Sequence, residues 1–157
     1  MALSPSTLKS QLENNWLVPE GGTFPSSPTE SANHFASAVA SWFGAAQANG
    51  IPCSTASARQ AQLSGLLGSA CQAGTAATAA QGVASALAAY IAGQLFGPGV
   101  AAPPVGVAAA SSSLTATFSN LDLDNSARAQ QIALACQTLA LTTVVTFPPP
   151  APPGNVL

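Results

Sequence analysis

The chain has 157 residues, enough for one domain or two very small ones, and 48% of them are hydrophobic. Only 5% carry charge, whereas an ordinary soluble domain carries about 25%. Three cations cannot neutralise the several phosphates that nucleic-acid binding normally requires, and a single histidine makes most metal and acid–base sites hard to assemble. The composition therefore argues against nucleic-acid binding and ordinary hydrolytic chemistry, and it predicts no catalytic residue, cofactor or metal.

The first predicted helix begins at Pro5, a first helical position where the missing N–H costs nothing, and Ser4 precedes it as a candidate N-cap. Its apolar stripe consists of side chains four residues apart, namely Leu8, Leu12 and Trp16. A sequence rich in Gly, Ser, Thr and Pro follows. We expect residues 1–26 to form an N-terminal helical arm and linker that docks on a partner.

The second predicted helix has the clearest start signal of the chain. Ser27 and Glu30 form a capping box, in which each side chain satisfies a backbone N–H at the other residue. The stripe expected to be buried consists of Phe35, Ala38, Val39, Trp42 and Ala46. Gly50 suits the left-handed conformation of a helix C-terminus and Pro52 cannot continue a helix, so the pattern predicts that this helix ends near Asn49.

Two further helices are predicted from about residue 54 to 72 and from about 78 to 96, where Gly97, Pro98 and Gly99 end the pattern. Residues 100–113 are predicted to be a small-residue linker that becomes helical toward its end. The segment 114–118 fits both a short strand and a helix, and the spacing does not decide between them.

The last predicted helix is capped by Asp124 or Asn125 and runs to about Leu141. The fold class predicted is therefore mainly α, a small bundle of about four to five helices. Residues 27–141 are expected to form this bundle domain.

The C-terminal segment 142–157 is predicted to be an extended, Pro-rich tail. Its β-branched residues 142–147 favour a strand or an extended arm, and the prolines of 148–153 favour polyproline II. Together with the N-terminal stripe, this tail is the candidate partner-binding site, which comprises Leu8, Leu12, Trp16, Phe147, Pro148, Pro149, Pro150, Pro152 and Pro153.

Two pairs of segments within the sequence resemble each other, and we call these similarities echoes. Residues 57–63 resemble residues 126–132, and residues 36–44 resemble residues 84–93. In so alanine-rich a sequence such similarity can arise by chance or from a duplication, and the sequence leaves both readings open.

Three groups of polar residues are candidate sites. Glu30 and His34 lie one helical turn apart, which is the spacing of a surface pair, and no nucleophile motif accompanies them. Asp122 and Asp124 start like a calcium loop whose remaining ligands are missing, so a helix N-cap is the interpretation. Arg59 and Arg128 stand near helix starts, where we expect them to pair with carboxylates or with a neighbouring subunit.

Cysteine usage and hydropathy bear on the compartment. The first residues lack the pattern of a secretory signal. Cys53, Cys71 and Cys136 are expected to be small apolar residues on helix faces, with pairing of the first two left open. Residues 77–96 are long enough to span a bilayer, but polar residues and glycines interrupt them, so a membrane span is not expected.

The pattern as a whole resembles the small alanine-rich structural proteins of tailed-bacteriophage virions, particularly tail, neck and baseplate subunits. The resemblance rests on the stripe ending at Trp16, the Pro19–Glu20–Gly21–Gly22 sequence after it, the low-charge helices, and residues 144–150. It implies a non-enzymatic assembly subunit, made in the bacterial host cytoplasm and incorporated into the virion in several symmetric copies.

Such a subunit would contact copies of itself and other virion proteins. A capsid cement or decoration protein is the nearer alternative. A small membrane-active lysis protein is the alternative from another class, and it requires residues 77–96 to insert into lipid.

Overall fold

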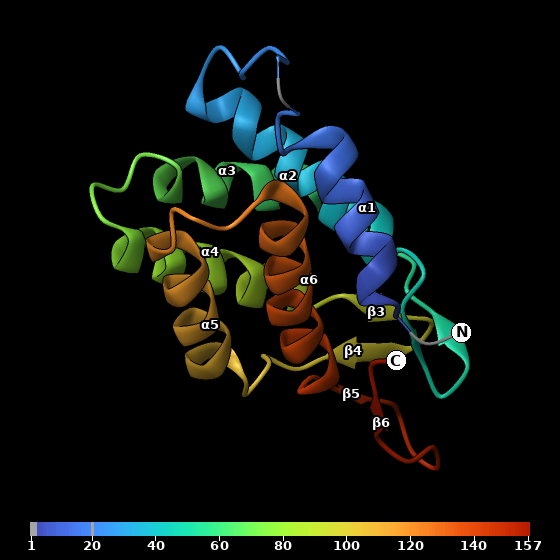
Figure 1. The fold of residues 1–157 in the computed structure, drawn as a ribbon. Coiled ribbons are helices and arrows are strands. Elements are labelled where there is room, and N and C mark those ends of the chain that lie inside the picture. Colours follow the sequence, from blue (N-terminus) through green and yellow to red (C-terminus); the bar gives the residue numbers. More distant parts are fainter. Residues whose placement is uncertain (1–2, 20) are drawn as a thin grey trace.

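The computed structural model describes residues 3–19 and 21–157, which are mainly helical with small antiparallel sheets (Figure 1). The helices in this part of the chain are α1 (Pro5–Asn15), α2 (Pro28–Phe43), α3 (Gln60–Ala70), α4 (Ala76–Ile91), α5 (Val107–Ser119) and α6 (Asn125–Leu141). The strands are β1 (Gln47–Ala48), β2 (Ile51–Pro52), β3 (Leu95–Phe96), β4 (Gly99–Ala101), β5 (Val144–Thr146) and β6 (Gly154–Asn155).

The six described helices form a closed ring. Each helix packs against the next one along the chain, and α6 packs back against α1 (Figure 1). Most buried helical side chains belong to α2, α4 and α6, which therefore form the centre of the ring, while α1, α3 and α5 lie between them.

The central helices are copies of one another in structure. Helices α2 and α4 both have 16 residues and start 48 positions apart, and α6 has 17 residues and starts 49 positions after α4. Each begins in the same way, because the side chain of the N-cap residue accepts a hydrogen bond from the backbone N–H three residues later. These N-cap residues are Ser27, Thr75 and Asp124.

The same spacing governs the core. Three helical positions are alanine in all three copies and buried in all three, namely Ala32, Ala80 and Ala129; Ala36, Ala84 and Ala133; and Ala38, Ala86 and Ala135. Larger side chains vary at other equivalent buried positions, such as Trp42, Tyr90 and Leu139. Alanine permits the close approach of neighbouring helices in the ring, such as α4 and α5, and the larger residues fill the remaining core.

A β-hairpin follows each central helix, and an equivalent backbone hydrogen bond closes the base of each hairpin. These bonds are Cys53 N to Ala46 O (2.9 Å), Ala101 N to Gln94 O (2.9 Å) and Val156 N to Thr143 O (3.2 Å). A second set joins each hairpin to the next, namely Ser54 N to Leu95 O (2.9 Å), Ala102 N to Val144 O (2.8 Å) and Leu157 N to Gln47 O (2.8 Å). The hairpins therefore form a second closed ring beneath the helices.

Helix α1 completes this threefold arrangement. In the first two units a hairpin is followed by a second helix, α3 or α5. The third hairpin, β5–β6, is the last one in the chain, and α1 occupies the equivalent place between α6 and α2. Its buried leucines match those of the other two helices, since Leu8 and Leu12 correspond to Leu63 and Leu67 of α3.

The fold is therefore a threefold repeat of helix, hairpin and helix. The first unit is α2–β1–β2–α3, the second is α4–β3–β4–α5, and the third is α6–β5–β6 completed by α1. Of the two echoes in the sequence, residues 36–44 and 84–93 follow this repeat. Residues 57–63 and 126–132 do not, because they lie at the starts of α3 and α6, which are not equivalent.

The structure corrects the predicted bounds of the central helices. Helices α2 and α4 end at Phe43 and Ile91, and the residues expected to end them form two-residue hairpin turns instead. Asn49 and Gly50 have φ of 50° and 78°, as a type I′ turn requires, and Gly97 has φ of 59° before Pro98. A glycine with positive φ serves a helix C-terminus and a tight hairpin equally well, which explains the error.

Two further expectations change. The end of the predicted linker, residues 107–113, and the ambiguous segment 114–118 belong to one helix, α5, whereas residues 100–101 lie in β4. The described chain therefore has six helices rather than four to five. The termini are not extended arms: Leu8 and Leu12 are fully buried in the ring, and β5 and β6 pair with each other and extend the sheet of β3 and β4. The predicted arm 1–26, bundle 27–141 and tail 142–157 thus contribute to one closed core.

Candidate assembly surfaces

The outer side of the hairpin layer is apolar. In the four-stranded sheet β3-β4-β5-β6 the side chains that point away from the core include Leu95, Val100 and Val144, which are 38%, 47% and 42% exposed. Antiparallel sheets with one solvated side normally place polar residues there. We call this surface the hairpin face, and it comprises Leu95, Val100, Val144 and Leu157 together with the uncharged polar residues Thr146 and Asn155, all of which are exposed.

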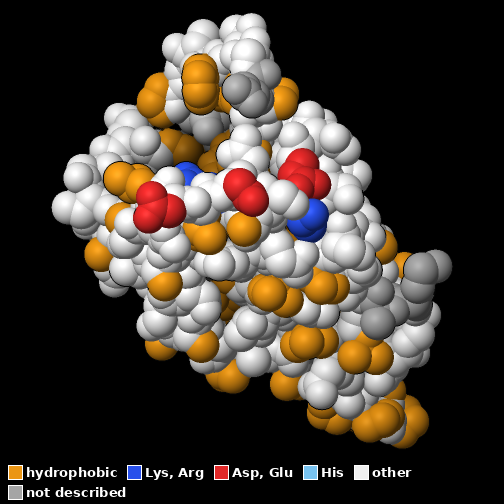
Figure 2. Space-filling view, in the orientation of Figure 1, with side chains coloured by type: hydrophobic (Ala, Val, Ile, Leu, Met, Phe, Trp, Pro, Cys, Tyr) orange, Lys and Arg blue, Asp and Glu red, His pale blue; other side chains and the backbone are white. Residues whose placement is uncertain are grey.

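The hairpin face also lacks charge. Residues 44–58, 92–119 and 142–157 contain no Asp, Glu, Lys, Arg or His. Arg59, the nearest cation in the sequence, turns inward and donates hydrogen bonds to the carbonyls of Ala92 and Ala89 at the end of α4. Figure 2 shows the charged side chains of the visible surface in its upper half and none over the hairpins. No like-charge repulsion would therefore oppose contact between two such faces.

Association at this face would use side chains rather than strand edges. An unpaired edge strand can add a strand from another chain. Here backbone hydrogen bonds such as Leu157 N to Gln47 O and Ser54 N to Leu95 O link the hairpins to one another. Sequence reasoning missed this face, although the Asn49–Gly50 pair is the strongest short-range hairpin signal.

The predicted C-terminal site is divided by the structure. Phe147 is buried against Gly99, where a side chain would collide with its ring, so it cannot contact a partner. The prolines of the same loop are exposed and remain available, namely Pro148, Pro149, Pro150, Pro152 and Pro153. The loop is held to the first hairpin by a hydrogen bond of 3.0 Å from Asn49 Nδ2 to the carbonyl of Pro152.

The predicted N-terminal site is used within the chain. Leu8 and Leu12 face the core, as described above. Trp16 is half-buried, and its ring meets that of Phe35 edge-on at a centroid distance of 4.9 Å. Its indole N–H donates to Ser31 Oγ at 2.9 Å. The stripe expected to bind a partner therefore holds α1 to its own ring.

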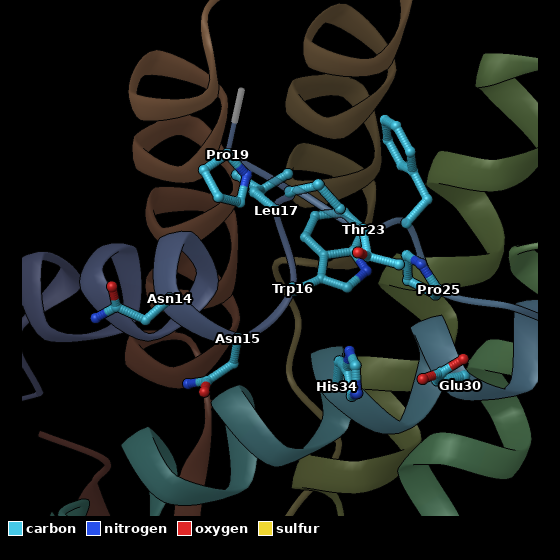
Figure 3. A pocket seen from close by; sticks show the side chains of 11 residues that line it. Asn14, Asn15, Trp16, Leu17, Pro19, Thr23, Pro25, Glu30 and His34 are labelled. Carbon is cyan, nitrogen blue, oxygen red and sulfur yellow. The ribbon is translucent and has the colours of Figure 1, made fainter. Parts of the chain in front are cut away.

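A groove lies under residues 16–27, which connect α1 to α2. Two adjoining cavities of about 250 and 360 Å³ lie there, and Trp16, Phe24 and Pro25 line both. Phe24 is 78% exposed. In Figure 3, Glu30 and His34 come from successive turns of α2, with Trp16 and Thr23 above them. The connection thus crosses the helices without filling the space beneath it.

Glu30 serves the helix start. Its carboxylate accepts hydrogen bonds from the hydroxyl and the backbone N–H of Ser26, each at 2.6 Å, and its own N–H donates to Ser27 Oγ at 3.2 Å. The capping box is therefore present, but its carboxylate binds Ser26 rather than Ser27. The Ser26 hydroxyl and then its N–H lower the pKa of Glu30, with a smaller contribution from His34. These hydrogen bonds stabilise the folded chain fully above the pKa that Glu30 has in the unfolded chain. The stabilisation is lost as the pH falls through the lower pKa that Glu30 has in the folded chain.

Asp124 and Arg128 also have structural partners. Asp124 accepts a hydrogen bond from Ala127 N at 2.6 Å, as predicted for a helix N-cap. Arg128 donates to the carbonyls of Asn120 and Leu123, both at 3.3 Å. The expectation that the arginines pair with carboxylates is not met within the described residues, where the one ion pair joins Lys9 to Glu13 at 3.2 Å.

The three cysteines are free thiols in the structure and differ in exposure. Cys136 is buried, which raises the pKa of its thiol to about 12, and burial also raises the pKa of the Cys53 thiol. Cys71 is exposed. Its thiol pKa is also raised by partial burial, so its reactive thiolate fraction grows as the pH rises.

We expect a disulfide reagent at pH 8 to label one thiol per folded chain rapidly. The Cys71→Ser variant should lose this fast phase, and Cys136 should react about 100-fold more slowly or more, because it must wait for the ring to open. The measurement is the time course of labelling in the native state and after unfolding in urea. Two fast thiols in the native state would contradict the packing of Cys53.

No helix in residues 3–19 and 21–157 is long and apolar enough to cross a membrane. In the candidate span 77–96, α4 ends at Ile91 and the chain turns into β3.

The described residues 3–19 and 21–157 hold no group of three or more His, Cys, Asp or Glu side chains that could bind a metal ion. Compared with known protein families, curated proteins and solved structures, the chain matches none.

Proposed function

We propose that this chain is a non-enzymatic structural subunit of a bacteriophage virion, incorporated in several copies into the tail, neck or baseplate through protein–protein contacts. The observation that supports the proposal is the hairpin face, an exposed surface with Leu95, Val100 and Val144 and no charged side chain. An apolar patch left open on a free monomer would favour association.

The low net charge also favours association between copies of the chain. A formal net charge of −2 on 157 residues provides little repulsion between copies. Several of the few charged residues bind helix ends or pair with each other, as Glu30, Asp124, Arg59 and the Lys9–Glu13 pair do. None of these residues belongs to the hairpin face, which is left to neutral contacts.

Light scattering behind a sizing column tests the proposal. The full chain at about 100 µM should elute as multiples of 15.4 kDa. A variant with Val100→Glu and Val144→Glu should lose at least about tenfold in association constant, because two charges would be desolvated at the contact. Its circular dichroism should stay unchanged, since both side chains point away from the core.

The matched control places the same two charges elsewhere. Leu66 of α3 and Leu134 of α6 are exposed to a similar degree and lie outside the hairpin face. A Leu66→Glu and Leu134→Glu variant should associate like the unmodified chain. A full chain that stays monomeric would contradict the proposal, and flotation of the protein with liposomes would favour the membrane-active alternative.

A further inference from the structure

We propose that α1 is an exchangeable element: in the assembled state it leaves its own ring and completes the third unit of a neighbouring copy. This inference rests on the proposed function, because it names how subunits that are already in contact become linked. The occupant of the site is a second copy of this chain, and the segment that it inserts is residues 3–18.

The place that α1 fills is a built site. Leu8 and Leu12 are fully buried there, between α6 and α2. Hydrogen bonds hold both ends of the segment: Trp42 Nε1 donates to the Ser4 carbonyl at 2.9 Å, and Asn125 Nδ2 donates to the Val18 carbonyl at 2.7 Å. These contacts are supplied by α2 and α6, and a second copy of α1 could make every one of them.

The threefold repeat identifies α1 as the helix that the chain does not tie to its unit. In the first two units the second helix follows its hairpin directly, after residues 53–59 for α3 and residues 102–106 for α5. In the third unit no chain connection runs from β6 to α1, because α1 precedes α2 in the sequence. The helix is therefore held in the third unit by packing and hydrogen bonds, without a direct chain connection to β6.

The connection between α1 and α2 is long enough to hand α1 to a neighbour. It has 12 residues, 16–27, whereas α3 to α4 and α5 to α6 are joined by five residues each, 71–75 and 120–124. Fully extended, 12 residues reach about 40 Å, more than the diameter of a helix pair. Two cavities lie beneath this connection, so it is only partly packed against the helices.

Exchange leaves nearly the same contacts in place, so the balance between the closed and exchanged forms depends on concentration. In a free monomer the chain's own α1 is present at an effective concentration of about millimolar, so it occupies the site between α6 and α2 in preference to the α1 of another copy. When the hairpin face holds two copies together, the neighbour's site is present at a similar effective concentration. Association at that face thus makes exchange competitive.

Cross-linking of the assembled full chain tests the inference. Cysteines at Val18 and Asn125, in a Cys71→Ser background, place one thiol on the moving segment and one on α6, at positions that contact each other. A short bismaleimide is added to the assembled sample, and the chains are then separated in denaturant. We expect at least half of the linked product to be covalent dimers and longer chains.

The outcomes separate the two proposals. Assembled protein whose links all lie within single chains overturns exchange and leaves the proposed function standing. A chain that never assembles overturns both the proposed function and this inference. The two variants with one introduced cysteine each, V18C and N125C in the same background, are the controls. Equal interchain linking in either of them also overturns exchange, since the links would then reflect proximity of copies.

Discussion

The Leu12→Ala variant is expected to lower the free energy of unfolding by about 2–5 kcal/mol, the usual cost of deleting a fully buried leucine side chain. The residue lies in the segment that resembled a docking arm, where truncation of a side chain would cost little. In the ring, however, Leu12 occupies the position of Leu67 in α3 and Leu114 in α5, and all three are buried.

The repeat supplies matched comparisons for this prediction. Leu67→Ala and Leu114→Ala should cost a similar amount, and urea unfolding followed by circular dichroism should show one transition for each variant. Lys9→Ala, a change at a partly exposed position on the same helix, should cost less than about 0.5 kcal/mol. If Leu12→Ala instead frees α1 while the other helices unfold at the unmodified midpoint, α1 is not part of the cooperative ring.

Much of the helical content could be predicted from local signals. The Pro5 start of α1 and the Ser27 cap of α2 depend on residues within one turn, and both are as expected. Ser4 precedes α1 as predicted, but its side chain makes no capping hydrogen bond. The start of α6 after Asp124 is also as expected. These predictions succeed because a helix N-terminus is settled by neighbouring side chains and needs no knowledge of the rest of the fold.

The hairpins were missed because their evidence is ambiguous at short range. Strands β1, β2, β3 and β6 have two residues each, too few for an alternating pattern. Their pairing depends on distant partners, as when Leu157 N donates to Gln47 O. The hairpin face results from that long-range pairing. Local sequence patterns therefore could not predict that Leu95, Val100 and Val144 lie on one surface.

The repeat was visible in part. The echo between residues 36–44 and 84–93 has the spacing of 48 residues that the structure shows. The third copy is shifted by one further residue and its hairpin has a long proline-rich loop, so its similarity is hidden. Its last helix is displaced to the N-terminus, where amphipathic spacing alone could not distinguish an arm from a core helix.

A circular permutant tests this interpretation of the third unit. Its chain would run from Thr23 to Leu157, continue directly into Met1, and end at Gly22. Six residues, namely 156, 157 and 1–4, would then join β6 to α1, compared with seven (53–59) before α3 and five (102–106) before α5. We expect the permutant to fold with unchanged helix content.

Its stability should be close to that of the original chain. The permutation closes a connection of six residues and opens one of 12, and halving a loop changes the closure cost by only about 0.6 kcal/mol. The measurement is urea unfolding followed by circular dichroism. A second permutant with the same junction, opened between Ala84 and Ser85 inside α4, should fail to fold, because it cuts a central helix.

The permutant also separates the two contacts proposed between copies. With α1 tied to β6 by six residues, its helix should stay in its own ring, while the hairpin face remains unchanged. The protein should therefore still associate on a sizing column, and the Val18 and Asn125 cysteine pair should link only within chains. A permutant that folds but still forms covalent dimers through this pair would show that the long connection to α2 is not what permits exchange. A permutant that cannot fold would show that α1 does not stand in for the missing helix of the third unit.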